Sequence, residues 1–304
     1  MKYAKVGGQA VMEGVMMRNK EKYAVAVRLP DKSIEQKVST HQMPKSIRWM
    51  HETPILRGII NFIDSLYLGM STLMYSASFF EEEEEQATAK SEEQKKKEDQ
   101  MTIGITVALS IVLALGLFFA LPYGLSLILQ RLHVPELLVV LSEGVIRLLI
   151  FIIYVALISL QSDIKRVFMY HGAEHKCINC IEHGLPLTVE NVRSSSKEHK
   201  RCGTSFLLIV MLVSIVVFMF IRIDSKLLRL AVRVVLIPVI AGLSYELLRL
   251  AGRHDNWLVN VLSKPGLWMQ GLTTKEPDDE MIEVGIAAVE AVFDWESWQK
   301  ENGV

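Results

Sequence analysis

All three cysteines of the protein and four of its histidines lie between residues 161 and 203. His171, His175, Cys177 and Cys180 come first, and Cys202 follows farther along the chain. Zinc prefers thiolate sulfur and imidazole nitrogen, and structural zinc sites hold four such ligands in a tetrahedron. The clustering therefore predicts a metal site in which Cys177, Cys180 and Cys202 supply sulfur and His171 or His175 supplies nitrogen.

The same stretch also fits a catalytic metal. His171-x-x-Glu174-His175 matches an inverted zinc-protease motif, in which two histidines bind the metal and the glutamate activates water. Residues four apart lie on one face of a helix, so both imidazoles would point the same way with Glu174 beside them. A catalytic site keeps one coordination position open, whereas three thiolates favour a closed, structural site. Both interpretations remain open at this point.

Other chemistry of these residues is less well supported. Cys177-x-x-Cys180 has the spacing of a redox dithiol, but the surrounding sequence lacks the βαβ pattern in which such motifs usually occur. The expected metal is zinc, and iron is the alternative because mixed sulfur and nitrogen ligands suit both. His254 and Asp255 form a further carboxylate–histidine pair, which could orient or extend a metal site.

A second segment of interest lies near the amino terminus. Residues Gly7–Arg18 contain closely spaced glycines, which allow the backbone to approach another group. Glu13 and Arg18 are the only charges in this segment, and we expect them to pair or to face a site. We interpret the segment as a loop, and Glu13 as a second candidate for a general base.

The elements that must position these residues are apolar. Half of the 304 residues are hydrophobic, 22% are charged, and the mean hydropathy is +0.27. A membrane-spanning helix needs roughly 20 mostly apolar residues. Four segments fit, which predicts a mainly α-helical polytopic membrane protein with about four transmembrane helices: Met101–Leu121, Leu137–Leu160, Thr204–Phe220 and Val234–Leu248.

The segment Ile55–Phe80 is apolar but carries Arg57, Asn61 and Asp64 near its beginning. We expect an amphipathic helix that lies on the membrane surface or against the bundle, with Thr53 as its N-cap. Spanning of the membrane by this segment is the alternative.

The remaining segments complete a domain plan. Lys22–Val27 and Ser33–Ser39 predict a β-hairpin in a small cytosolic N-terminal unit. Near the carboxyl terminus we expect a turn at Lys264–Gly266 and an amphipathic helix over residues 279–298. The plan reads: 1–52 N-terminal unit, 53–80 amphipathic helix, 81–100 charged linker, 101–160 first two spans, 161–203 Cys/His loop, 204–251 last two spans, and 252–304 cytosolic C-terminal region.

Charge placement predicts orientation. Residues 1–100 contain fifteen lysines and arginines, and residues 161–203 contain seven. Cytoplasmic loops carry an excess of these residues, so we expect both termini and the Cys/His loop in the cytoplasm. We expect no signal peptide, because no short apolar region follows Met1. The net charge of −1 and the absence of a nucleic-acid motif give no indication of nucleic-acid binding.

Four separated motifs, in order along the chain, resemble the YqhQ family of bacterial membrane proteins: Gly7–Arg18, Tyr170–Cys180, Arg201–Phe206 and Pro265–Gln270. The similarity runs from end to end. It implies residence in the bacterial inner membrane and dependence on a metal, without supplying a reaction. It also implies that Gly8, Glu13 and Arg18 are site residues.

Two classes of function follow from these expectations. One is a membrane scaffold or adaptor whose cytosolic part folds around zinc and binds other membrane proteins, such as translocation or insertion machinery. The other is a metal-dependent hydrolase at the cytosolic membrane surface, with Glu174 or Glu13 as general base. Sulfur-rich sites are more often structural, which favours the scaffold. Glu143 and Arg147 are the charged pair of the apolar segments, and alone they give transport little support.

Overall fold

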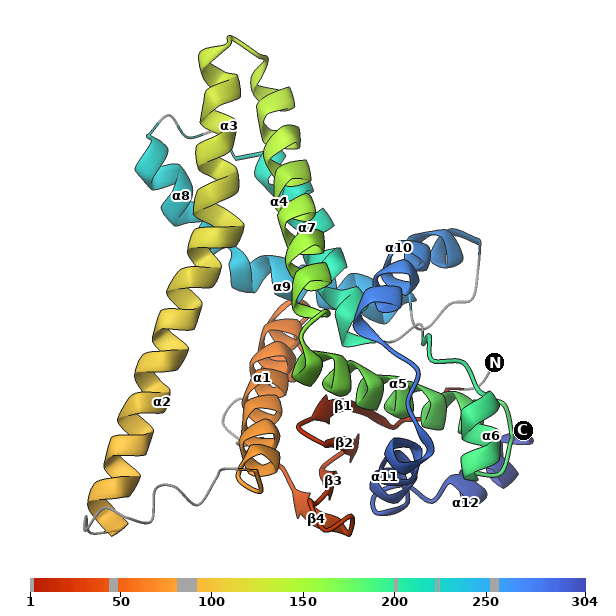
Figure 1. The fold of residues 1–304 in the computed structure, drawn as a ribbon. Coiled ribbons are helices and arrows are strands. Elements are labelled where there is room, and N and C mark those ends of the chain that lie inside the picture. Colours follow the sequence, from red (N-terminus) through yellow and green to blue (C-terminus); the bar gives the residue numbers. More distant parts are fainter. Residues whose placement is uncertain are drawn as a thin grey trace. The chain divides into compact units, whose positions relative to one another are not determined.

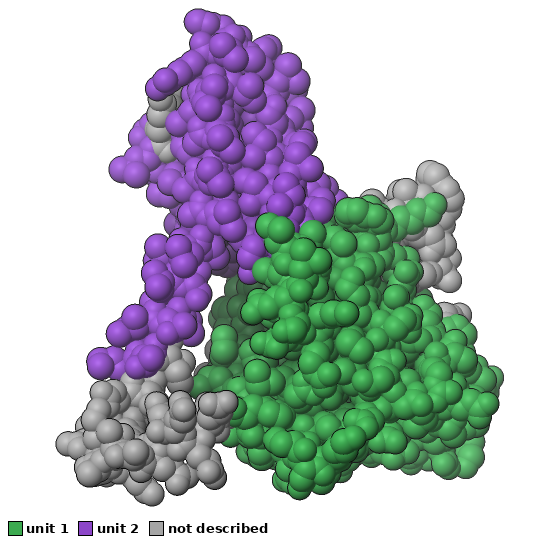
Figure 2. Space-filling model, viewed as in Figure 1, with its two compact units in different colours: residues 1–80, 155–209, 241–304 green, residues 81–154, 210–240 purple. Residues whose placement is uncertain are grey.

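The computed structural model describes residues 3–43, 49–80, 92–199, 202–221, 223, 225–251 and 257–304. The chain forms two compact units, each assembled from separate stretches of sequence. Figure 2 shows the first unit in green and the second in purple. The first comprises residues 1–80, 155–209 and 241–304, and the second comprises residues 81–154 and 210–240.

The first unit is built on a four-stranded antiparallel sheet whose strands follow one another in chain order. The predicted hairpin is confirmed as β3 and β4, but Gly7–Arg18 is not a loop: it forms β1 and most of β2. The strands are β1 (Gly7–Val11), β2 (Gly14–Asn19), β3 (Lys22–Arg28) and β4 (Ile34–Thr40). Glycine permits this because a Cβ on Gly14 would lie 2.3 Å from the carbonyl oxygen of Ala26 on β3.

Both faces of the sheet are covered, so the first unit has three layers. Side chains alternate along a strand, and Val15 and Met17 of β2 face helices α5 (Ser162–Glu182) and α11 (Asp279–Glu290). Met16 faces the opposite side with Val25 and Leu68, where helix α1 (Leu56–Ala77) packs. Figure 1 shows the sheet between these helices.

The stretch 161–203, expected as a loop, is largely helical. It contains α5 and the short helix α6 (Val189–Ser194), which begins at an N-cap bond from the Asn191 amide to the Thr188 hydroxyl. From Tyr170 to Glu182 almost every residue of α5 is buried, polar ones included. Because its polar side chains bond to the sheet edge and neighbouring segments, α5 shows no simple apolar stripe in the sequence.

Helix α1 confirms the expected helix within Ile55–Phe80, although its start differs from the prediction. The residue before the helix is Ile55, with φ of 69° and no side-chain cap, so Thr53 is not the N-cap. The helix meets α9 (Ile237–Ala251) closely, since a Cβ on Gly58 would lie 2.8 Å from the Cα of Gly242. The face of α1 opposite the sheet, here called the outer face, is exposed and apolar: Ile63, Leu66, Tyr67, Met70, Leu73 and Met74.

The C-terminal region differs from the prediction in two places. Helix α10 (Trp257–Thr273) runs through the expected turn at Lys264–Gly266, with Pro265 inside the helix. The single helix expected over residues 279–298 is two helices, α11 and α12 (Trp295–Asn302). The second starts where the Asp294 side chain accepts from the Ser297 amide. His254 and Asp255 lie outside the described residues.

The apolar helices are α2 (Glu92–Leu115), the π-helical turn η3 (Gly116–Ala120), α3 (Leu121–Arg131), α4 (Glu136–Ile158), α7 (Gly203–Met219), α8 (Lys226–Val235) and α9. Within the described ranges, two helical stretches have the length and composition to cross a membrane, Gly104–Arg131 and Glu136–Ile158. The pair α8–α9, bent by 43°, makes a third if it is one span, and α7 is a shorter apolar helix. Of the expected linker, residues 81–91 lie outside the described part, and residues 92–100 belong to α2.

Buried charges connect helices of the second unit. Arg147 donates to the Glu143 carboxylate at 2.8 Å, which confirms the expected pair, and also to the Ser214 hydroxyl at 3.0 Å. Arg233 of α8 donates to the same Glu143 oxygen. Since burying an unpaired charge among apolar helices is costly, this network ties α8 to α4.

Candidate metal centre

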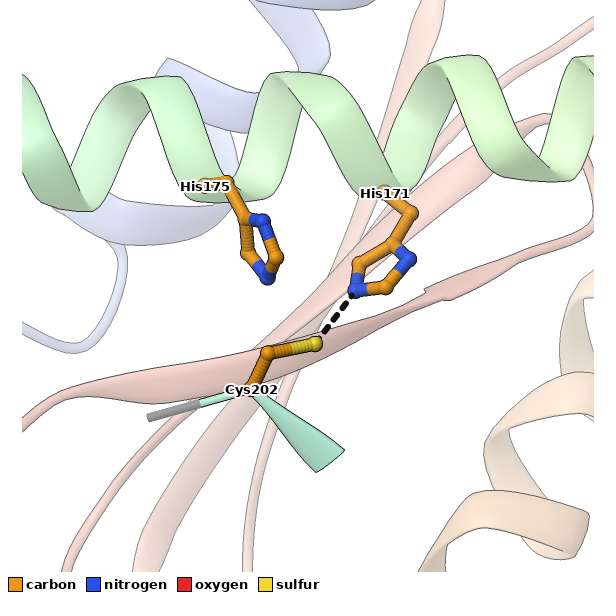
Figure 3. Close-up of side chains that lie close together, drawn as sticks. All are labelled: His171, His175 and Cys202. Atoms are coloured by element: carbon orange, nitrogen blue, oxygen red, sulfur yellow. Dashed lines mark hydrogen bonds between the residues drawn. The ribbon is translucent and has the colours of Figure 1, made fainter. Parts of the chain in front are cut away.

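Three of the predicted ligands come together in the first unit. One ligand atom from each of His171, His175 and Cys202 lies within 4.8 Å of the other two. The histidines project from successive turns of α5, and Cys202 immediately precedes α7 (Figure 3). The Cys202 sulfur lies 3.3 Å from the Nε2 atom of His171. Two nitrogens and one sulfur at this spacing suit a zinc ion.

Both histidines are oriented for metal binding by backbone carbonyls. The Nδ1 atom of His171 lies 2.9 Å from the carbonyl oxygen of Thr273, and that of His175 lies 2.7 Å from the carbonyl oxygen of Lys197. A carbonyl oxygen only accepts, so the network assigns the proton to Nδ1 of each ring. The lone pair is then left on each Nε2 atom, the atom nearest Cys202.

A glycine on α5 lets the segment that follows Thr273 approach the helix. A Cβ on Gly172 would lie 2.0 Å from the carbonyl oxygen of Lys275, so a larger residue would push the 273–277 segment away. The Lys275 amide also donates to the carbonyl oxygen of Phe168 at 2.9 Å. Gly172 lowers helix propensity, but it allows the carbonyl of Thr273 to reach His171.

The third candidate ligand, Cys202, is contacted by the amide and the hydroxyl of Thr204. The Thr204 amide donates to the Cys202 sulfur at 3.4 Å, and the Thr204 hydroxyl lies 3.1 Å from it. These two contacts fix the direction in which the sulfur points. Cys202 is buried, so these bonds are shielded from solvent.

Gln270 of α10 bonds to residues on both sides of Cys202. Its amide oxygen accepts from the His199 amide at 2.8 Å, and its amide nitrogen donates to the His199 carbonyl at 2.8 Å and to the Ser205 hydroxyl at 3.1 Å. Gln270 is fully buried. One side chain thus holds both flanks of the cysteine, which sets the position of its sulfur.

Glu174 lies beside the two histidines, as the motif predicted. One carboxylate oxygen accepts from the Gly8 amide at 3.0 Å. The other lies 3.5 Å from Nε2 of His175 and 4.0 Å from Nε2 of His171. Gly8 is required here, because a Cβ would lie 2.2 Å from the Met16 carbonyl oxygen and 3.3 Å from the Glu174 side chain. The carboxylate is therefore oriented toward the centre by the strand.

The same arrangement docks α5 along the edge of the sheet. Glu182 accepts from the Ala4 amide at 2.8 Å, as Glu174 does from Gly8. The two glutamates are separated by about 12 Å along the helix. The two amides are separated by about 13 Å along an extended chain. The matching distances let both pairs form at once, and the second Glu182 oxygen lies 3.2 Å from Nε2 of His199.

A cavity of about 520 Å³ adjoins the three ligands. Its walls come from β1, β2, α1, α5 and the segment before α7. The polar lining includes Arg18, Lys20, Glu174 and His199 in addition to the ligands, and the remaining lining residues are mostly small or apolar: Val6, Gly7, Gly8, Met16, Leu68 and Ile178 among them. The centre therefore opens onto a space that can hold a small molecule or one end of a larger one.

The structure does not bring Cys177 and Cys180 to this centre. Cys177 lies in the core between α5 and α11, where a Cβ on Gly285 would be 3.0 Å from its sulfur. Burial raises the pKa of the Cys177 thiol well above its usual value and also raises that of Cys180, whose sulfur lies 3.4 Å from the Pro186 carbonyl. On a helix, residues 177 and 180 do not share the face of residues 171, 174 and 175.

Glu13 also lies away from the three candidate ligands. It lies in the β1–β2 turn with φ of 48°, and its carboxylate forms a two-pronged ion pair with Arg166 of α5. It is not among the residues that line the cavity. Of the three residues that the family resemblance added, Gly8 and Arg18 do line the cavity, and Arg18 pairs with Asp64 at 2.7 Å rather than with Glu13.

Sequence reasoning did not assign roles to Gln270, His199 or Glu182. Gln270 ends one of the four family motifs, which was the available signal, but the motif gave no contact. His199 and Glu182 stand in the Cys/His stretch without a recognisable spacing to the ligands. Their contacts depend on how α10 and the first residues of the chain fold back on α5.

The chain is similar to proteins of one family. The model of a family described as "Protein of unknown function (DUF1385)" matches residues 53–295. A protein of Bacillus subtilis (strain 168) called "Uncharacterized protein YqhQ" is 37% identical over 301 residues, which cover 97% of this chain and 94% of that protein. No solved structure matches.

Proposed function

This chain belongs to the YqhQ family, the proteins of unknown function matched by DUF1385, and we propose that it is a metal-dependent hydrolase. One observation carries the proposal. Three ligand atoms converge on the wall of a cavity, with the carboxylate of Glu174 beside them. Three protein ligands leave a coordination position for water or substrate, which distinguishes catalytic from structural zinc sites.

Each residue of the centre has a separate role in the proposed hydrolysis. His171, His175 and Cys202 would hold the ion, which when bound lowers the pKa of a water molecule and polarises the substrate's oxygen. Glu174 accepts the proton of the attacking water and returns it to the leaving group. The Gly8 amide holds one oxygen of Glu174, so the other stays directed at the centre. The cavity holds the substrate's reacting end in place.

The scaffold interpretation loses its main argument. It depended on three thiolates in one closed site, and the geometry places Cys202 alone with the two histidines. A zinc-stabilised adaptor for other membrane proteins, including translocation or insertion machinery, would also not require Glu174 to be held between the Gly8 amide and the imidazoles. We therefore rank the hydrolase above the adaptor.

We further propose a membrane setting for the enzyme. Four spans are formed by α2–α3, α4, α7 and the bent pair α8–α9, with both termini and the metal centre in the cytoplasm of a bacterial cell. Length and composition support α2–α3, α4 and the bent pair α8–α9 taken as one span, and α7 is a shorter apolar helix. The many lysines and arginines of residues 1–100 and 161–203 support the orientation. In this setting the lipid bilayer surrounds the four spans and is a partner of the protein.

The test begins with metal. Detergent-purified protein is expected to contain close to one zinc per chain, and Glu174→Gln should retain that zinc because the amide can still accept from Gly8. Turnover of a panel of chromogenic esters and fluorogenic peptides should fall by about 10²–10⁴-fold in Glu174→Gln, the usual contribution of a general base.

The matched control is Glu13→Gln, which removes the other predicted base and should leave turnover unchanged. Full activity of Glu174→Gln would rule out the assigned base. Protein without bound metal would overturn both the hydrolase and the zinc-stabilised adaptor. Metal-loaded protein that hydrolyses nothing in the panel would count against the hydrolase and favour the adaptor.

A further inference from the structure

Building on the proposed hydrolase, we propose that the substrate is a membrane lipid. An ester bond at the headgroup end of the lipid enters the cavity, while the hydrocarbon chains remain outside it in the bilayer. Three features of the first unit carry this inference: the places where the ligands stand in the chain, the two faces of α1, and the size and lining of the cavity.

Along the chain, the candidate ligands lie close to the ends of apolar helices. Cys202 is followed at once by Gly203, the first residue of α7. Helix α4 ends at Ile158, and α5 begins at Ser162. His171 is nine residues into α5, about 14 Å along the helix. If α4 and α7 span the bilayer, the chain itself therefore keeps the metal centre close to the membrane surface.

Helix α1 connects the cavity with an apolar surface. Leu68 and Ser65 line the cavity from the face of α1 that meets the sheet. The outer face of the same helix exposes six large apolar side chains, from Ile63 to Met74. Rows of this kind on amphipathic helices mark membrane contact, and the long apolar helices elsewhere in this chain make the bilayer the fitting occupant.

The cavity suits one end of a lipid rather than a whole one. Its volume of about 520 Å³ is typical of sites for drug-sized ligands, so long hydrocarbon chains must stay outside. Val6, Met16, Leu68 and Ile178 supply apolar wall, while Lys20 and Arg18, which is paired with Asp64, supply cationic wall. A group that is apolar on one side and anionic on the other, such as a phospholipid headgroup with its glycerol, matches this lining.

An extended peptide fits less well. Peptides often bind such sites by adding a strand to a sheet edge, and β1 is an edge strand. Three amides along this edge are already bonded to side chains: Ala4 donates to Glu182, Gly8 to Glu174 and Met12 to the Ser76 hydroxyl. A peptide strand would have to displace the proposed general base from Gly8.

The reaction balances with water alone. The water oxygen forms a new bond to the acyl carbon or the phosphorus, and the ester bond from that atom to its leaving oxygen breaks. Glu174 takes a proton from the water and passes it to the leaving oxygen. The products are an alcohol and an acid, and no oxidant or second co-reactant is consumed.

The experiment uses the full-length, zinc-loaded protein in detergent. It is mixed with vesicles of phosphatidylglycerol and phosphatidylethanolamine, and the products are identified by mass spectrometry. Two parallel arms use the water-soluble short-chain forms of the same lipids and a set of membrane-spanning peptides. We expect lipid cleavage that requires Glu174, with a kcat/KM at least tenfold higher for the long-chain lipids than for the short-chain forms. A fatty acid product identifies an acyl ester, and a released phosphate group identifies a phosphoester.

Two variants separate substrate delivery from chemistry. Leu66→Ser on the outer face of α1 should lower cleavage of vesicle lipid several-fold and leave cleavage of the short-chain form unchanged. Val38→Ser on β4, an exposed apolar residue outside α1, is the control and should change neither.

The outcomes distinguish the two proposals. Cleavage of peptides but not of lipids, or equal kcat/KM for long and short chains, overturns the lipid assignment and leaves the hydrolase standing. No cleavage in any arm by zinc-loaded protein overturns both. Equal effects of Leu66→Ser and Val38→Ser would remove α1 from substrate delivery and, with it, the argument that points to a lipid.

Discussion

The two sides of helix α5 both carry residue types that can bind a metal, but they differ in what surrounds them. One side presents His171, Glu174 and His175 to a cavity, where backbone carbonyls and the Gly8 amide orient them. The other side presents Cys177 and Cys180 to a closed apolar core and to backbone carbonyls. Residue type alone therefore did not identify the candidate ligands. The helical face on which each residue lies did.

Replacing a ligand should have the largest effect and would test this contrast directly. His175→Ala or Cys202→Ser should reduce bound zinc from about one per chain to near zero, because two ligands rarely retain the ion. Cys180→Ser, on the other side of the helix, is the control and should keep its zinc. Elemental analysis of detergent-purified proteins is the measurement. Loss of zinc in Cys180→Ser with retention in Cys202→Ser would reverse the assignment of the two sides.

A smaller loss is expected from the group that positions a ligand. Gln270→Ala should weaken zinc binding about 10–100-fold, the usual cost of removing a partner that orders a ligand. Competition with a chelator measures the affinity, and the absorption spectrum of the cobalt-substituted protein reports whether the sulfur still binds.

Gln299→Ala is the matched control, because Gln299 also bonds two backbone groups, the carbonyls of Ile181 and Leu185, but away from the centre. Equal zinc affinity and an unchanged cobalt spectrum in Gln270→Ala would show that the segment around Cys202 is held by other contacts.

The core side of α5 should respond in stability rather than in metal content. Cys177→Ser places a hydroxyl in a fully buried apolar site and should cost about 1–3 kcal/mol in the free energy of unfolding. Zinc content should stay the same. Denaturant titration of the metal-loaded protein tests the first expectation, and an unchanged midpoint would mean that the hydroxyl finds a partner there.

The smallest effect is one of thiol reactivity. Burial raises the pKa of Cys177 well above its usual value, so the folded protein keeps this thiol protonated as pH rises from about 7 to 9, whereas the unfolded chain ionises. Its contribution to stability is thus present below the unfolded pKa and declines above it. Alkylation counted by mass spectrometry should find Cys177 unmodified in folded protein at both pH values. Modification that increases with pH would contradict its burial.

The sequence was sufficient for features that depend on local pattern. The hairpin of β3 and β4, the helix over most of Ile55–Phe80 and the pairing of Glu143 with Arg147 are all read from neighbouring residues. The grouping of His171 with His175, and of Glu174 with both, follows from helical spacing once a helix is assumed.

Features that depend on distant segments could not be read in this way. The glycine-rich Gly7–Arg18 segment is a pair of strands because the neighbouring strand and α5 approach it closely, and nothing within the segment shows that approach. The residue type of Cys177 predicted a ligand, but in the folded protein Cys177 packs in the core with α11. Pro265 predicted a turn, but it lies inside α10. A proline can lie within a helix when neighbouring groups satisfy the backbone.

The interleaved order of the first unit has a consequence for synthesis. Its sheet is complete at Thr40, but α11, which covers part of one face, begins only at Asp279. A ribosome adds about 5–20 residues per second, so that face waits on the order of ten seconds or more for its cover. During this time the apolar helices that lie between the three sequence stretches of the first unit must also leave the ribosome. A chain that stops before α11 would leave Ala24 and Ala26 of β3 without part of their packing, so loss of residues 279–304 should harm the protein more than their distance from the candidate metal centre suggests.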